Sequence, residues 1–109
     1  MIEIPLIQQP NQELNIVLND QSCTIQIKQL GDYVYLSLWL DDTLIRESAI
    51  CMIGVFILQG AKTAFNGNFV FIDDTSPAND QSQPDYKQFD DRFKLYYVTD
   101  DEISANELD

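Results

Sequence analysis

The 109-residue chain has 18 Asp and Glu residues against 6 Lys and Arg residues and no histidine, giving a formal net charge of -12. So negative a surface repels nucleic-acid phosphates and anionic membranes, and the few basic residues are scattered along the chain rather than gathered in a stripe. Without histidine the chain lacks the commonest general base and metal ligand, which argues against hydrolytic or zinc enzymes of the familiar kinds.

The first half of the chain alternates apolar and polar residues with a period of two, as in β-strands with one buried face. The run ELNIVL at 13–18 is followed by an Asn-Asp pair and by SCTIQIK at 22–28, which predicts a β-hairpin. A Leu-Gly-Asp turn then leads to YVYLSLWL at 33–40. Together these three runs predict an antiparallel meander with one face on the core.

The run at 33–40 has two different faces. Its even-numbered residues are Val34, Leu36, Leu38 and Leu40, and its odd-numbered residues are Tyr33, Tyr35, Ser37 and Trp39. Tyrosine and tryptophan are enriched at protein interfaces, because they bury a large area and keep a polar group for hydrogen bonding. Tyr33, Tyr35 and Trp39 are therefore candidates for a partner-binding patch. The alternative is that this face packs under the apolar segment 50–58 and belongs to the core.

The middle of the chain is less regular. We expect a short strand at Thr43–Arg46 and an irregular apolar segment at Ile50–Leu58, since Gly54 and several β-branched residues disfavour a buried helix there. The sequence Asn-Gly-Asn at 66–68 predicts a turn into the strand FVFI at 69–72.

The last third of the chain begins with the polar segment Asp73–Gln88, which contains two prolines and predicts a long surface loop. The alternating run RFKLYYV at 92–98 predicts a final strand. The acidic segment 99–109 has little apolar content, so we expect a frayed tail or at most one helical turn.

These elements predict a mainly β protein. Residues 1–98 would form a single small domain, in which an antiparallel meander closes into a barrel-like or sandwich-like sheet, and residues 99–109 would form an acidic C-terminal tail. The first ten residues lack the basic and long apolar segments of a signal peptide. The apolar run at 50–58 is far shorter than the roughly 20 residues of a membrane-spanning helix. We therefore expect synthesis in the cytoplasm and no membrane insertion.

Two cysteines, Cys23 and Cys51, lie within apolar or alternating runs. The position of each thiol predicts a buried, reduced side chain that packs as a small hydrophobe. A disulfide or a reactive thiol is the alternative, although no compact cysteine motif supports either.

Adjacent aspartates occur four times, at 41–42, 73–74, 90–91 and 100–101. Neighbouring side chains on a strand point to opposite faces, so one such pair cannot form a catalytic dyad by itself. Aspartate favours turns and places charge at sheet edges, which predicts that the pairs mark the ends of strands. A weak cation site in DDTSPAND at 73–80 and a glycosidase-type carboxylate pair are the alternatives. We therefore predict no catalytic residue, no cofactor and no metal site.

Six segments of the chain follow one another in a recognisable order. They are IEIPL at 2–6, NQELNIVLNDQSCTIQI at 11–27, VYLSLWLDDTL at 34–44, LIRESAICMIGVFIL at 44–58, and GNFVFIDDTSPANDQSQPDY at 67–86 with FKLYYV at 93–98. This order resembles that of the small baseplate (hub) plug proteins of contractile-tailed bacteriophages: an opening strand and hairpin, a third strand with an acidic turn, an apolar segment, and a closing Tyr-Tyr strand. The resemblance spans residues 2–98.

The resemblance implies a structural component of a phage or prophage tail that is not an enzyme. Such a protein, made in the cytoplasm of the bacterial host, would sit in the virion tail at the hub or tail-tube end and help to close the lumen before injection. Its partners would be hub, spike or tail-tube proteins, without direct nucleic-acid binding or membrane contact, and self-association into a homo-oligomer stays open. The alternative function is a stand-alone acidic inhibitor that mimics DNA, although the acids gather at turns and in the tail.

Overall fold

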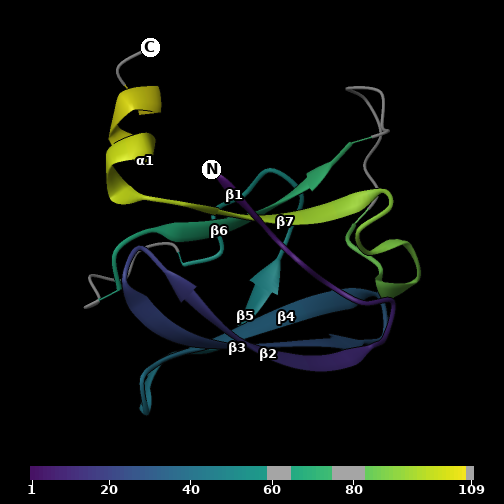
Figure 1. Ribbon diagram of the computed structural model, residues 1–109. Coiled ribbons are helices and arrows are strands. Elements are labelled where there is room, and N and C mark those ends of the chain that lie inside the picture. The colour runs from purple at the N-terminus through teal and green to yellow at the C-terminus, as the bar shows by residue number, and fades with distance from the viewer. Residues whose placement is uncertain (59–64, 75–82, 108–109) are drawn as a thin grey trace.

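The computed structural model describes residues 1–58, 65–74 and 83–107, which form two antiparallel sheets packed face to face (Figure 1). The four-stranded sheet contains, in spatial order, β2 (Asn11–Leu18), β3 (Gln21–Leu30), β4 (Tyr33–Leu40) and β5 (Thr43–Cys51). The three-stranded sheet contains β1 (Ile2–Ile4), β7 (Phe93–Val98) and β6 (Asn68–Asp73). A 3-10 helix at Tyr86–Gln88 precedes β7, and helix α1 (Asp100–Glu107) follows it. The prediction of a mainly β protein is confirmed. The arrangement is sandwich-like, with no closed barrel among the described residues.

The predicted meander is confirmed, and β5 extends it to four strands. The hairpin between β2 and β3 turns at Asn19 and Asp20, whose φ angles of 52° and 62° lie in the left-handed region. Asparagine and aspartate tolerate this region better than other non-glycine residues, and such a turn matches the right-handed twist of the two strands. The turn fixes the register, in which Leu14 lies opposite Ile25 and Ile16 lies opposite Cys23.

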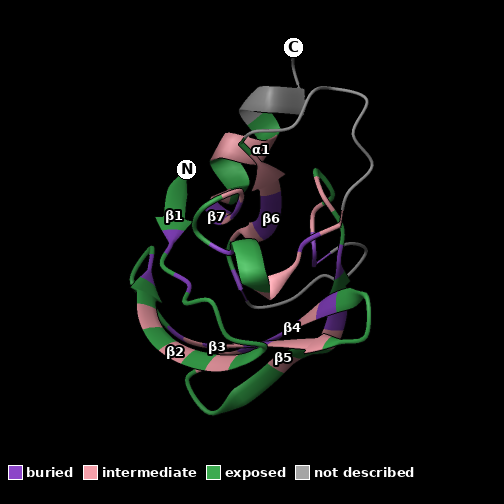
Figure 2. Ribbon diagram, turned by 90° about the vertical axis from the view of Figure 1, so that its right-hand side faces the viewer, coloured by how far each residue is buried: buried purple, intermediate pink, exposed green. Residues whose placement is uncertain are grey.

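The core lies between the two sheets, and buried residues alternate with less buried ones along the strands (Figure 2). Its fully buried members include Ile25, Ile27, Leu36 and Leu38 from one sheet and Phe69, Phe71, Leu95 and Tyr97 from the other. Burial of each such side chain contributes about 1.5–3 kcal/mol relative to leaving it exposed. The period of two in the sequence therefore becomes a continuous apolar layer.

Strand β5 is longer than the predicted strand at Thr43–Arg46, because a bulge carries it on to Cys51. Ser48 has a φ of 51° and shifts the register, after which Ala49 and Cys51 point inward. The irregular apolar segment therefore begins at Met52 instead of Ile50.

The structure also differs from the predicted loop at 73–88. Asp73 is the last residue of β6, residues 75–82 lie outside the described part, and the loop ends in the 3-10 helix. Two ion pairs link the start of this loop to the start of β7: Arg92 Nη2 lies 2.8 Å from Asp73, and Lys94 Nζ lies 3.0 Å from Asp74.

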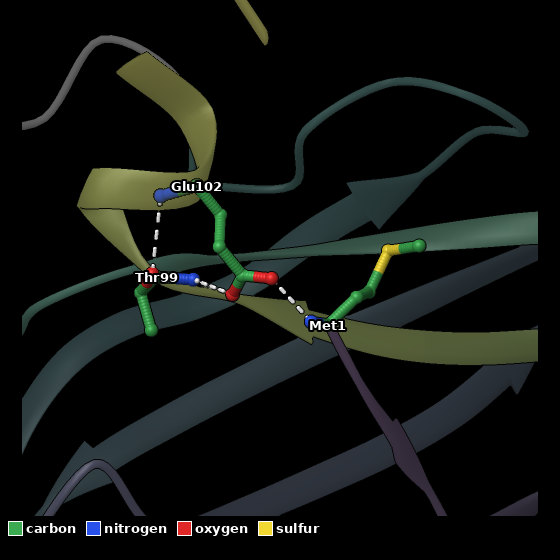
Figure 3. A network of polar contacts seen from close by, with 3 residues as sticks. All are labelled: Met1, Thr99 and Glu102. Atoms are coloured by element: carbon green, nitrogen blue, oxygen red, sulfur yellow. Dashed lines mark hydrogen bonds and ion pairs between the residues drawn. The ribbon is translucent and has the colours of Figure 1, made fainter. Parts of the chain in front are cut away.

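The C-terminal segment forms the eight-residue helix α1, so the prediction of at most one helical turn was wrong. Thr99 and Glu102 form a capping box (Figure 3). The Thr99 N–H donates to Glu102 Oε1 at 2.9 Å, and the Glu102 N–H donates to Thr99 Oγ1 at 3.1 Å. The α-ammonium of Met1 contacts the other oxygen of Glu102. Acidic residues in the first turn also suit the positive end of the helix dipole.

The contacts of Glu102 predict a pH-dependent α1. The hydrogen bond from the Met1 ammonium, with that from Thr99, lowers the pKa of Glu102 below its usual 4.5. The ionised carboxylate of Glu102 therefore stabilises α1 fully above pH 4.5, and this stabilisation is lost as the pH falls through the lowered pKa. The protection of the α1 amides from exchange, measured by NMR relative to the intrinsic rate at each pH, should fall over this acidic range. Glu102→Gln should exchange faster at neutral pH and lose this acid-dependent step. A Gln variant with the wild-type profile would contradict the assignment.

Gly67 occupies a position that only glycine fits. Its φ is 116°, and a Cβ built there would lie 2.4 Å from the Tyr97 ring and 2.5 Å from the Val98 carbonyl oxygen. Gly31 has a φ of 63° but open space around it. Gly67 therefore allows the chain to pass closely over the buried ring of Tyr97 before β6 begins.

We expect Gly67→Ala to lower the free energy of unfolding by about 3 kcal/mol, since backbone strain adds to overpacking. Gly31→Ala is the matched control and should lower it by about 1 kcal/mol, from strain alone. Urea unfolding followed by circular dichroism would measure both. Equal losses in the two variants would show that the close approach to Tyr97 is unimportant.

Candidate protein-binding face

The three predicted interface residues lie on the outer face of the four-stranded sheet, because the odd-numbered side chains of β4 point away from the core. Tyr33 is 44% exposed, and Tyr35 and Trp39 are half-buried. The alternative that segment 50–58 covers these rings does not hold. Ile50 is exposed, and residues 53–58 run along β6 of the other sheet, where the Ile57 N–H donates to the Phe69 carbonyl.

Strand pairing adds two aliphatic side chains to this face. Tyr35 lies opposite Ile50 of β5, and Trp39 lies opposite Leu44. Ile50 and Leu44 are 44% and 45% exposed. Side chains directly opposite on neighbouring strands have Cβ atoms about 4.5–5.5 Å apart, so each aromatic ring has an aliphatic neighbour. We call these four residues, together with Tyr33, the outer apolar patch.

Ser37 lies between Tyr35 and Trp39 in the sequence of outward positions, yet it is only 3% exposed. Its hydroxyl oxygen accepts a hydrogen bond from the Ser48 N–H at 2.9 Å, at the bulge of β5. Sequence reasoning placed Ser37 on the same open face as its neighbours and missed this role, because a bulge on one strand is not visible in the alternation of the next. The buried serine holds the patch on β4 and β5 in one register.

The end of the patch at Trp39 borders an open cleft of about 320 Å³, lined by Glu13, Thr24, Trp39, Asp41 and Asp42. A cleft of about 380 Å³ adjoins it along β2 and β3 and shares Thr24 and the two aspartates. Three carboxylates beside a tryptophan ring suit a lysine or arginine side chain of a partner, through charge-assisted hydrogen bonds and a cation–π contact. No local pattern in the sequence predicts this arrangement, because Glu13 joins the aspartates only through the pairing of three strands.

The aspartate pairs lie where the turn interpretation predicts. The first and third pairs occupy turns, with positive φ at Asp41 and Asp90, the second ends β6, and the fourth begins α1. The described residues contain no group of three or more metal-ligating side chains suited to an ion. The alternative cation site at 73–80 falls mostly on residues outside the described part.

Carboxylates also meet on the other sheet. Glu3 and Asp90 share a hydrogen bond, which raises the pKa of Glu3. The hydrogen bond between Lys94 and Asp74 raises the pKa of that lysine. These side chains lie at the surface of the sheet, so their contacts affect the surface charge and do not form an enclosed site.

Cys23 and Cys51 are both free and buried, as predicted. Burial raises the pKa of each thiol, most strongly for Cys51, so the reactive thiolate form is disfavoured. Both residues act as small hydrophobes in the core. No helix in the described ranges has the length and hydropathy needed to span a membrane.

Comparison with known proteins gives one family match. The family described as cyanophage baseplate Pam3 plug gp18 matches residues 1–101, which include both sheets and the start of α1. No curated protein matches the chain.

Ser37→Ala tests the link between the bulge and the patch. Loss of the hydroxyl acceptor leaves the Ser48 N–H unpaired, and we expect the free energy of unfolding to fall by about 1–3 kcal/mol. Ser22→Ala, at an exposed outward position of β3, should change it by less than about 0.5 kcal/mol. Urea unfolding would compare the two. Similar small effects would mean that the Ser37 hydroxyl does not hold the bulge.

Proposed function

Because the chain belongs to the cyanophage baseplate plug family, we propose that it closes the tail tube at the baseplate hub through protein–protein contacts. Membership makes it a structural component of a phage tail baseplate, whose neighbours are other baseplate or tail proteins. The finer proposal is that these neighbours are hub, spike or tail-tube proteins and that the plug closes the lumen before injection. It would be made in the cytoplasm of the bacterial host and then joined to the virion tail.

The outer apolar patch carries this proposal. Aromatic and aliphatic side chains at Tyr35, Trp39, Leu44 and Ile50 form two adjacent rows on a solvent-facing sheet surface. Well-packed aromatic anchors surrounded by polar residues are the usual source of binding energy at interfaces. The acidic cleft beside Trp39 would add a polar contact at the rim. The patch would therefore bind a partner surface with matching apolar and basic groups.

The charge of the chain also suits a plug. A net charge of -12 on a small protein would repel DNA held in the tube above it, so the plug would not adhere to the genome that must pass. This role requires no catalysis and no cofactor.

A DNA-mimicking inhibitor is the second candidate, since such inhibitors also require a high negative charge. Mimicry needs carboxylates arrayed along one face at phosphate-like spacing. Here the aspartate pairs lie in the turn after β4, at the end of β6, in the turn before β7 and in the first turn of α1. The distribution of charge therefore favours the plug.

Single substitutions in the patch should weaken partner binding and leave the fold intact. Trp39→Ala and Tyr35→Ala should each reduce affinity for a hub, spike or tube protein of the same tail by roughly tenfold or more, as expected for interface anchors. Pull-down and calorimetry with each purified neighbour would measure binding, and circular dichroism would follow the fold.

Tyr96→Ala is the matched control, because Tyr96 is a half-buried tyrosine on the outer face of the other sheet. It should bind like the wild type. Loss of fold in step with loss of binding for Trp39→Ala would assign that ring to the core. Failure to bind any hub, spike or tube protein would remove the plug assignment.

A further inference from the structure

The two sheets have four edge strands, and three of them are protected. β1 has only three residues, and residues 53–57 cover the edge of β6, where the Gly54 N–H donates to the Phe71 carbonyl at 2.9 Å. β5 is interrupted by the bulge at Ser48 and carries Arg46 and Glu47 next to it. Short, covered, bulged or charged edges prevent unwanted strand pairing. These three edges are therefore closed to a further strand.

β2 has none of these protections. Its eight residues pair with β3 in an unbroken register from Asn11 to Leu18, and the strand contains no proline, no lysine and a single charge, at Glu13. The other side of β2 pairs with no strand in the described part of the chain. β2 is therefore a long, regular and open edge.

The register identifies which backbone groups are open. The Gln29 N–H donates to the Pro10 carbonyl at 2.8 Å, and these two residues lie opposite each other in the continued register. Hydrogen-bonded pairs alternate along antiparallel strands, so the even-numbered residues of β2 bond to β3. The N–H and C=O groups of the odd-numbered residues point away from the sheet. These residues are Asn11, Glu13, Asn15 and Val17.

The side chains of β2 show that the core is also incomplete at this edge. Leu14 and Ile16 point inward and pack against the core, but they are only half-buried, whereas Ile25 and Cys23 opposite them on β3 are buried. A strand added beyond β2 could place apolar side chains over Leu14 and Ile16. It would extend the apolar layer and the hydrogen-bonded ladder together.

Charge selects the occupant of this edge. Glu13 is exposed on the outer face, one strand spacing (about 4.8 Å) from an added strand, and the acidic clefts at Asp41 and Asp42 lie on the same face. A second copy of the chain would bring another charge of -12 to this surface and be repelled. A basic segment would be attracted and oriented.

We propose that the open edge of β2 accepts an extended segment of a partner protein as a fifth strand of the sheet. The segment alternates apolar side chains, which cover Leu14 and Ile16, with lysine or arginine side chains on the side of Glu13. This edge is distinct from the outer apolar patch on β4 and β5, so its use does not depend on the patch or on closure of the tail tube.

The probe is a synthetic eight-residue peptide in which valine alternates with lysine, titrated into the full chain by calorimetry. Asn15→Pro removes an N–H that points away from the sheet and breaks no backbone hydrogen bond to β3, so it should weaken peptide binding by roughly tenfold or more. It also removes the side-chain hydrogen bond from Thr24 Oγ1 to Asn15 Oδ1. Asn15→Thr keeps that N–H and should bind within about twofold of the wild type. A peptide with glutamate in place of lysine should bind much more weakly. Undiminished binding by Asn15→Pro would overturn the proposal.

Amide exchange on the wild-type protein provides a second test that does not depend on the folding of the proline variant. Binding of the valine–lysine peptide should slow exchange at Glu13, Asn15 and Val17 by about tenfold or more, as for newly hydrogen-bonded amides. Unchanged exchange at these three residues would also overturn the proposal. Sedimentation of the protein alone tests the occupant: a dimer that Asn15→Pro dissociates would replace the basic partner by a second copy.

Discussion

The packing of two apolar sheet faces against each other is the interaction on which the rest of this structure depends. Phe69, Phe71 and Tyr97 form the aromatic half of the layer, in which ring centroids of Phe69 and Tyr97 lie 5.7 Å apart. Aliphatic side chains of β3 and β4 fill the other half. Because every strand has one face committed to this layer, its other face is free for contact with solvent or with partners. The binding surfaces follow from this division.

Two parts of the four-stranded sheet are suited to contact. The outer apolar patch on β4 and β5 presents side chains, and the edge of β2 presents backbone groups, so the two would recognise different features of a partner. Ser37 and the bulge at Ser48 have two roles on β4 and β5: the bulge sets the register of the patch, and it protects the edge of β5. A baseplate protein surrounded by several neighbours could use the patch and the edge at once.

The acidic character has local causes as well as a global effect. Aspartates occupy tight turns such as those at Asp41 and Asp90, where their side chains tolerate a positive φ. Other acids cap α1, and Asp73 pairs with Arg92 at the end of β6. Each has a structural reason to be where it is, and their sum gives a surface that repels DNA. In the proposed plug, the acidic residues that close the turns would therefore also repel DNA.

The sequence by itself determined most of the strands, the meander and the buried thiols, because alternation and turn residues are local signals. The family followed from the resemblance in the order of the segments. It also identified Tyr33, Tyr35 and Trp39 as side chains opposite the apolar face. It did not predict the continuation of β5 through Ser48 or the full length of α1, although the spacing of Thr99 and Glu102 matches a capping box. Only the tertiary structure decided that Ser37 is buried, that Glu13 meets the acidic turn, and that the edge of β2 stays open. Those features depend on which strands become neighbours, and strand pairing joins residues whose separation along the chain carries no local signal.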